Sequence, residues 1–328
     1  MANLGTWLMG IRLNNPIIVG ASGLTGLADG VEKAAGSGAG AIVLKSLFEE
    51  QILATLGKEL EGIDIDSYPE AEAFIARTAW EEYSEEYLEL IRESKKRAQN
   101  VPIFASINLV GTGNWAEFAR RIEEAGADAL ELNIAFMPFS PSVSGREIEQ
   151  KVLSTVKEAR LATRLPIQVK LGSNYTSLPH LVHGLSKEGV NAVVLFNRFY
   201  RFDIDLTSMK LAGVQPLSSP VEYHETLRWT SILYKRAGVE IVSSTGIHSG
   251  EAVAKCILAG ASATEVCSVI YQKGWKVLGT MLEELDEIVE SLGFSSLDQM
   301  QGKMAAVNAQ HPEEYLRLQY IKALTGFY

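Results

Sequence analysis

Residues 241–270 read IVSSTGIHSGEAVAKCILAGASATEVCSVI and contain a complete strand–helix–strand unit. An apolar run leads into Thr245–Gly250, a helical pattern follows from Ser249, and Gly260 precedes a second apolar run. Glycine just past the last turn is a common end signal of a helix. The same junction recurs in EEAGADALEL (123–132), SKEGVNAVVL (186–195) and YKRAGVEIVS (234–243). This repeat predicts strands that alternate with helices in a parallel sheet.

Eight short runs rich in Val, Ile, Leu and Ala have the composition of buried parallel strands. They are Ile17–Ala21, Ala41–Ser46, Pro102–Asn108, Ala129–Ile134, Pro166–Leu171, Ala192–Asn197, Glu240–Thr245 and Thr264–Val269. Helical patterns begin near Asn114, Ser144, Ser177, Val221, Ser249 and Gln272, and glycines at expected C-cap positions are Gly126, Gly189, Gly238 and Gly260. Eight repeats predict a single (β/α)8 barrel. A doubly wound sheet is the less favoured alternative, because no G-x-G-x-x-G follows the first strand.

We expect the barrel to span residues 1–294 and a C-terminal helical extension, 295–328, to pack on it. Two segments exceed the minimal repeat: the acidic, irregular stretch 47–80 and the stretch 198–220. Both follow strands, at the end where barrels carry active sites, so we expect lids or binding loops. Surface elaborations or oligomer contacts are the alternative. The acidic runs Glu81–Glu93 and Glu283–Glu290 are expected to be solvated helix faces.

Composition excludes several classes of protein. The 328 residues are 47% hydrophobic and carry a net charge of -10, which argues against nucleic-acid binding and a polybasic membrane surface. Cys256 and Cys267 are too few for a four-thiolate metal site. No signal peptide and no apolar run of about 18 residues is present. We expect a cytoplasmic protein without a bound metal; the His180/His183 pair is expected to be a surface pair.

Polar residues stand at the carboxyl ends of the expected strands, where a barrel gathers its site. Among them, Lys45 and Lys170 lie within apolar runs. Because burying an unpaired ammonium costs on the order of several kcal/mol, we expect both lysines to be buried beside a ligand. A salt bridge is the alternative, but Glu131 is the only obvious carboxylate and cannot serve both.

The stretch Thr245–Gly250 has the character of a phosphate loop, because it is small, contains glycine and opens a helix. Backbone N–H groups at a helix N-terminus favour an anion. Many barrels hold a phosphate after strands seven and eight. Sugar phosphates and FMN both fit such a place, so the loop alone does not name the ligand.

Six segments resemble the dihydroorotate dehydrogenase family, over roughly residues 1–290. They are LNNPIIVGASGLTG (13–26), VLKS (43–46), LELNIAF (130–136), QVKL (168–171), LFN (195–197) and the stretch 241–270. The resemblance implies FMN, hydride transfer from dihydroorotate or a related dihydropyrimidine, and a place in pyrimidine biosynthesis. Within that family, the chain is similar to the soluble branch, whose members are commonly homodimeric.

The resemblance also implies roles for matching positions. Lys170 would face N1 and O2 of the flavin and stabilise its anionic reduced form. Lys45 would lie near flavin and substrate, while Asn133 and Asn197 would bind the amide edge of the substrate ring and border the flavin. The other implied flavin contacts are Ala21, Ser22, Gly23, Ser46, Asn108, Ser218, Ser219, Ser244, Thr245, Gly246, Cys267 and Ser268.

The chain departs from the family after the fourth strand. The family motif Asn-x-Ser-Cys (or Ser)-Pro-Asn supplies the general base, whereas this chain reads NIAFMPFSP from Asn133 to Pro141. Phenylalanine and methionine accept no proton, and Ser140 substitutes only if the loop folds back. Two alternatives therefore stay open. One is an FMN barrel that has lost dihydroorotate oxidation, and the other is a non-flavin aldolase or isomerase with a Schiff-base lysine at position 170 or 45.

Overall fold

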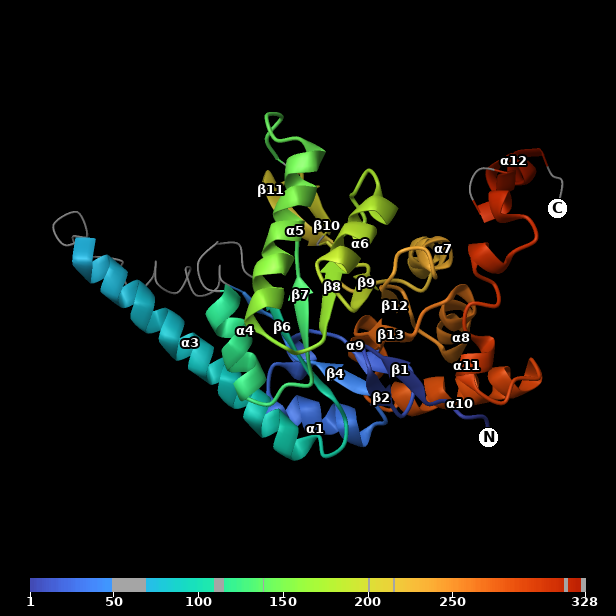
Figure 1. The fold of residues 1–328 in the computed structure, drawn as a ribbon, viewed down its shortest axis with the longest axis horizontal. Helices are drawn as coiled ribbons and strands as arrows, with labels where there is room; N and C mark the ends of the chain where they lie inside the picture. The colour runs from blue at the N-terminus through green and yellow to red at the C-terminus, as the bar shows by residue number, and fades with distance from the viewer. Residues whose placement is uncertain are drawn as a thin grey trace.

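The computed structural model describes residues 1–48, 69–108, 115–137, 139–199, 201–214, 216–315 and 318–325. A ring of parallel strands occupies the centre, and helices surround it (Figure 1). In order around the ring, the strands are β3 (Ile17–Val19), β4 (Ala41–Val43), β6 (Ile103–Asn108), β7 (Ala129–Asn133), β8 (Ile167–Leu171), β9 (Ala192–Leu195), β12 (Glu240–Ser244) and β13 (Ala263–Val266). Because β13 pairs with β3 and β4 pairs with β6, the sheet closes. The predicted (β/α)8 barrel is confirmed.

The amino-terminal end of the barrel is closed by a hairpin of β1 (Thr6–Leu8) and β2 (Ile11–Leu13). Leu8 and Leu13 are fully buried and pack with Phe104 and other inward-facing strand residues. The Thr6 hydroxyl donates to the carbonyl of Ser262 across 3.0 Å. This plug leaves the carboxyl ends of the strands as the open end of the barrel.

Helices cover the outside of the barrel and bury the apolar outer faces of its strands. They are α1 (Ala28–Gly36), α3 (Pro69–Arg97), α4 (Trp115–Glu124), α5 (Gly145–Ala162), α6 (Leu178–Lys187), α7 (Tyr223–Leu233), α8 (Gly250–Ala259), α9 (Ser268–Lys273) and α10 (Val277–Ser291). Serine side chains accept from main-chain N–H groups at the starts of α5 and α8, where Ser144 and Ser249 are the N-caps.

The predicted helix starts are confirmed near Ser144, Ser177, Val221 and Ser249. The start near Asn114 lies outside the described residues, and α4 is described from Trp115. The start near Gln272 is wrong, because Gln272 lies inside α9 and the next helix begins at Val277. The eighth strand also ends earlier than predicted, at Val266, because Ser268 already begins α9.

Gly260 ends α8 in the left-handed conformation, with a φ of 119°. A Cβ at this position would also meet the ring of Tyr234 at 2.4 Å. The residue is therefore required to be glycine for both its conformation and its close packing.

The two long segments after strands differ in structure. Within 47–80, residues 47 and 48 form β5 (Leu47–Phe48), 49–68 lie outside the described residues, and α3 begins at Pro69. The prediction of irregular structure is thus wrong for 69–80. The stretch 198–220 carries an antiparallel hairpin of β10 (Arg201–Asp205) and β11 (Lys210–Val214) that projects from the barrel (Figure 1).

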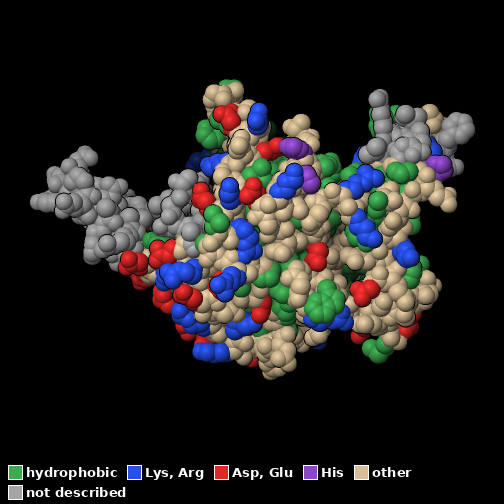
Figure 2. All heavy atoms as spheres, viewed as in Figure 1, with side chains coloured by type: hydrophobic (Ala, Val, Ile, Leu, Met, Phe, Trp, Pro, Cys, Tyr) green, Lys and Arg blue, Asp and Glu red, His purple; other side chains and the backbone are tan. Residues whose placement is uncertain are grey.

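The glutamates of the acidic run Glu81–Glu93 lie on the solvent face of α3, as predicted, while Tyr87 and Ile91 of the same run face the core. Figure 2 shows acidic and basic side chains mixed on this side of the molecule. Exposed ion pairs account for the mixture, such as those of Arg92 with Glu85 and Glu89. Such exposed pairs contribute little to stability, so this face is a solubilising surface.

The described residues of the C-terminal segment form α11 (Leu297–Met300), α12 (Leu318–Thr325) and the short 3-10 turns η3 (Ala306–Asn308) and η4 (Pro312–Tyr315). Helix α11 contacts α8, and η3 contacts α7. The domain boundary at residue 294 stays a prediction. Over the described part of the chain, no helix combines the length and the apolar character needed to cross a membrane.

Candidate active site at the open end of the barrel

A cavity of about 260 Å³ opens at the carboxyl ends of the barrel strands. Five strands contribute to its wall: β3, β8, β9, β12 and β13, through their last residues or the loops that follow. The predicted site residues that line it are Ala21, Lys170, Asn197, Ser218, Ser244, Thr245, Gly246, Cys267 and Ser268. Barrel closure therefore brings together residues that are widely separated in the sequence.

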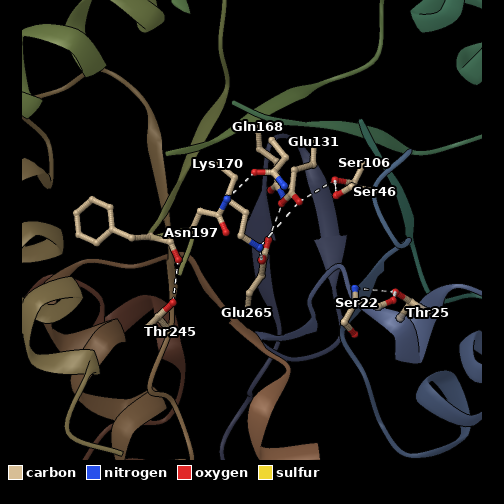
Figure 3. A network of polar contacts seen from close by, with 12 residues as sticks. Ser22, Thr25, Ser46, Ser106, Glu131, Gln168, Lys170, Asn197, Thr245 and Glu265 are labelled. Carbon is tan, nitrogen blue, oxygen red and sulfur yellow. Dashed lines mark hydrogen bonds and ion pairs between the residues drawn. The ribbon is translucent and has the colours of Figure 1, made fainter. Parts of the chain in front are cut away.

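Lys170 is a buried cation in this cavity, with a side chain 11% exposed. Its Nζ donates to Oε2 of Glu265 across 2.6 Å, and Oε1 of Glu131 lies 4.0 Å away (Figure 3). The expectation that Glu131 is the only available carboxylate is wrong, because the eighth strand brings Glu265 closer. Burial alone would lower the pKa of Lys170. The charges of Glu131 and Glu265 outweigh this effect and raise the pKa above its usual value.

A buried polar network continues from this ion pair across the barrel (Figure 3). The amide of Gln168 donates to Oε2 of Glu131 at 2.8 Å and to Oε1 of Glu265 at 3.1 Å. On the other side, the Ser106 hydroxyl donates to Oε1 of Glu131 across 3.0 Å, and the Ser46 hydroxyl lies 2.8 Å from that of Ser106. Ser46 is thus held in the barrel wall and does not line the cavity.

The network holds two carboxyl groups and one ammonium, so its net charge depends on whether one of the carboxyl groups is protonated. Burial, and next the negative charge of Glu265, raise the pKa of Glu131 to about 8. Glu131 is fully buried, whereas Glu265 forms the short ion pair with Lys170. At neutral pH, Glu131 is therefore the protonated member and Glu265 is the counterion.

Glu131→Gln should flatten the pH dependence of stability between about pH 5 and pH 8. In the unfolded chain this carboxyl ionises near its ordinary pKa of 4.5, and in the folded protein near 8. The folded state therefore binds an extra proton between these values. The resulting stability is complete below the unfolded pKa and is lost as pH rises through the folded one, at roughly 1.4 kcal/mol per pH unit.

Urea unfolding at several pH values measures this effect, with exposed Glu117→Gln on α4 as a control for removing a carboxylate. The free energy of unfolding of the wild type and of the control should fall with pH over this window relative to that of Glu131→Gln. Parallel profiles for all three proteins would contradict the protonation of Glu131.

The loops after β12 and β13 border the cavity with residues 245–247 and 267–268. Ser218 joins them: its N–H donates to Oγ of Ser268 across 2.9 Å, and its hydroxyl accepts from the N–H of Gly246 at 3.3 Å. The same hydroxyl lies 3.0 Å from Nε2 of His248. These contacts assemble small polar groups that suit a phosphate.

The first turn of α8 is satisfied by protein groups. The Ser249 hydroxyl accepts from the N–H of Ala252, and the N–H of Gly250 donates to Oε2 of Glu284 across 2.7 Å. The expectation that these helix amides bind a phosphate is wrong, because a carboxylate from α10 already occupies the position. The polar groups at the cavity belong to the loop before the helix.

The three predicted asparagines have different surroundings. Nδ2 of Asn197 donates to Oδ1 of Asn133 across 2.9 Å, which places these two side chains together. Asn197 lines the cavity, and Asn133 is buried beside it. Asn108 ends β6, where it pairs in register with Phe48 of β5, and it does not line the cavity.

Lys45 is exposed, so the expectation of its burial is wrong. It borders a separate groove of about 470 Å³ with Ser46, Tyr83 and Glu86. Strand β4 ends at Val43. Two residues later, Lys45 is beyond the barrel wall, and its ammonium needs no buried partner.

Comparison with known proteins identifies the family. Residues 77–289, more than half of the chain, match the family model described as dihydroorotate dehydrogenase. The chain belongs to the dihydroorotate dehydrogenase family. The resemblance predicted from the six segments is confirmed, and with it the assignment to a family of oxidoreductases.

Curated members of the dihydroorotate dehydrogenase family are similar over most of their length. The dihydroorotate dehydrogenase B (NAD(+)) catalytic subunit of Thermoplasma acidophilum is 25% identical, over 92% of this chain and 99% of the relative. The protein of the same name from Pyrococcus abyssi is 28% identical, over 90% and 97%. A putative dihydroorotate dehydrogenase A (fumarate) of Aeropyrum pernix is 30% identical, over 62% and 67%.

The residue expected to replace the dihydroorotate dehydrogenase base lies elsewhere. The Ser140 hydroxyl lies 2.7 Å from that of Ser142, in a turn before α5, and it does not line the cavity. Met137 and Phe139 are exposed on the same loop, and Pro138 lies outside the described residues. The loop therefore does not fold back over the cavity.

Three further predicted flavin contacts do not line the cavity. Ser22 accepts from the N–H of Leu24 and caps the 3-10 turn η1 (Gly23–Thr25), which contains Gly23. Ser219 turns toward Glu222, to which its N–H and hydroxyl both donate. Their assignment to the flavin stays a prediction.

Glu265 lines the cavity and was missed from the sequence as a site residue, and Arg198, at the end of the expected sixth strand, lines the cavity as well. Glu265 interrupts the apolar run ATEV just as Lys170 interrupts QVKL, so the same criterion would have found it. Nε of Arg198 donates to Oε2 of Glu222 across 2.8 Å, which anchors the base of the β10–β11 hairpin.

Proposed function

We propose that the chain is an FMN-dependent oxidoreductase that removes hydride from dihydroorotate or a related dihydropyrimidine. The observation that carries the proposal is the position of the buried Lys170 in the same cavity as the two loops after β12 and β13. A cation for an electron-rich ring and polar loops for a phosphate are the two requirements of such a cofactor. Membership in the dihydroorotate dehydrogenase family supports the same reaction class.

The residues around the cavity suit FMN. Gly20 and Ala21 line one wall of the cavity with small residues, which leaves space for a ring. A Cβ on Gly20 would stand 3.2 Å from Oε2 of Glu265. Ser218 and Ser268 present hydroxyls beside Gly246, where a phosphate would be held. When bound, FMN supplies a ring that accepts hydride.

The protein would orient the substrate and position charge. Asn133 and Asn197, held together by their hydrogen bond, would bind the amide edge of the substrate ring. Lys170 would stabilise negative charge that develops during the reaction. Oxidation of a CH–CH unit releases one hydride and one proton. Because Ser140 does not line the cavity, we propose that the proton leaves to water.

The aldolase or isomerase alternative is disfavoured by the state of Lys170. A Schiff-base lysine needs a lowered pKa, so that the neutral amine attacks a carbonyl. In this protein, nearby carboxylates outweigh burial and raise the pKa of Lys170. Lys45 is exposed, and it has no pocket of the kind that desolvates an amine.

We also propose a cytoplasmic homodimer, as the resemblance to the soluble branch implies. The β10–β11 hairpin supports an interface, because Phe202, Ile204 and Leu211 are more than half exposed. Light scattering of the purified protein would test this: a mass near 35.8 kDa, that of one chain, would contradict it.

Anaerobic mixing with dihydroorotate tests the proposed reaction. The protein should purify yellow, and its visible flavin band should bleach on mixing. A yellow protein that bleaches with dithionite but not with dihydroorotate would favour an FMN barrel with a changed substrate or a lost reaction. A colourless protein that takes up no FMN would reject the flavin function.

A further inference from the structure

The cavity wall carries a charge pair instead of a single cation. Lys170 and Glu265 both line the cavity, and their charged atoms are 2.6 Å apart. Both side chains are nearly fully buried, so water screens the pair only weakly. Glu131, which lies 4.0 Å from the same ammonium, does not line the cavity.

This pairing changes what a ring in the cavity experiences. A lone ammonium favours the addition of electrons to a neighbouring ring, whereas a neighbouring carboxylate opposes it. With the charges so close together, the pair acts as a dipole, and its field falls off faster than that of one charge. The contribution of the Glu265 carboxylate opposes the addition of electrons wherever the ring lies in the cavity, because a negative charge repels added electrons in every direction.

We propose that Glu265 is a positioning residue that lowers the reduction potential of the bound flavin, by fixing the Lys170 ammonium and offsetting its charge. The inference rests on the proposed FMN function. In this proposal Glu265 acts through Lys170 and exchanges no electron or proton with the substrate.

Glu131 can replace Glu265 as the counterion of Lys170 in the same network. Glu265 forms the short ion pair with Lys170, whereas burial raises the pKa of Glu131, and Glu131 lies close enough to Lys170 to become the counterion if Glu265 is removed. The two carboxyl groups should therefore act non-additively. Replacing Glu131 alone removes no charge, replacing Glu265 alone moves the carboxylate away from the cavity, and replacing both leaves the ammonium alone.

The test is the midpoint potential of the bound flavin, measured near neutral pH by equilibration with a reference dye. Glu131→Gln should leave the ratio of reduced to oxidised flavin at a fixed dye potential within about twofold of the wild type. Glu265→Gln should raise that ratio at least about tenfold, which is roughly 30 mV for a two-electron couple. The double variant should raise it further than Glu265→Gln alone.

Equal potentials for the wild type and Glu265→Gln, both with FMN bound, would overturn the inference and leave the proposed function intact. A wild-type protein that binds no FMN would instead reject the function on which the inference rests. If Glu265→Gln does not fold, the neutral pair Lys170→Met/Glu265→Gln replaces it, because it leaves no unpaired lysine. The ratio of reduced to oxidised flavin in this double variant should stay within about threefold of the wild-type ratio. A large drop in that ratio would overturn the inference.

Discussion

Gly246→Ala should lower the free energy of unfolding by about 2–5 kcal/mol and abolish flavin binding. Gly246 has a φ of +77°, a left-handed conformation that costs other residues roughly 1–2 kcal/mol. A Cβ there would also lie 2.3 Å from N of Tyr223 and 2.8 Å from C of Glu222. Because these are main-chain atoms at the start of α7, no side-chain rotation relieves the contact.

Gly293→Ala is the matched control, because Gly293, in the left-handed turn after α10, has a φ of +78° but open space around its Cα. It should lose only the conformational part, about 1–2 kcal/mol, and keep its flavin. Urea unfolding of the flavin-free proteins and the flavin content after purification measure both effects. Equal losses of stability in the two variants would show that the contact with α7 does not matter.

Lys170→Met should destabilise the protein by about 3–5 kcal/mol, because it leaves buried carboxyl groups without their cation. Glu265 is 2% exposed and loses its 2.6 Å partner, while Glu131 loses the nearby positive charge. Methionine fills a similar volume, so packing changes little. The loss should be larger at pH 8 than at pH 5, since protonated carboxyl groups need no counterion.

The double variant Lys170→Met/Glu265→Gln should recover most of that stability, to within about 1 kcal/mol of the wild type, because replacing a whole buried ion pair is often neutral. Unfolding is measured without FMN, since a ligand adds stability of its own. A double variant as unstable as Lys170→Met would indicate that shape at position 170 matters more than charge. Such a result would contradict the assignment of Glu265 as the counterion.

The barrel was predictable because its signals are local. Each barrel strand begins within one residue of its predicted start, since apolar runs of a few residues mark buried strands regardless of their neighbours. Gly260 marks the end of α8 for the same reason: its backbone conformation excludes other residues. The position of the site followed from the fold, because polar residues at strand ends meet at one end of a barrel.

Residues 69–80 show the limit of such local signals. Their acidic, irregular pattern predicted a loop, yet they form the first turns of α3. The partners of the site residues were equally hidden. Lys45 and Lys170 both interrupt apolar runs, but the first is exposed and the second is buried. The difference depends on where each strand ends in the closed barrel.

The sequence by itself thus determined the barrel, the family and part of the set of residues that line the cavity. Tertiary structure alone decided the charge of that site. Glu265 reaches Lys170 across 95 positions of sequence, and Glu284 occupies the helix start expected to bind a phosphate. The physical reason is that a buried charge takes its nearest partner in space, and spatial proximity between distant residues exists only once the barrel has closed.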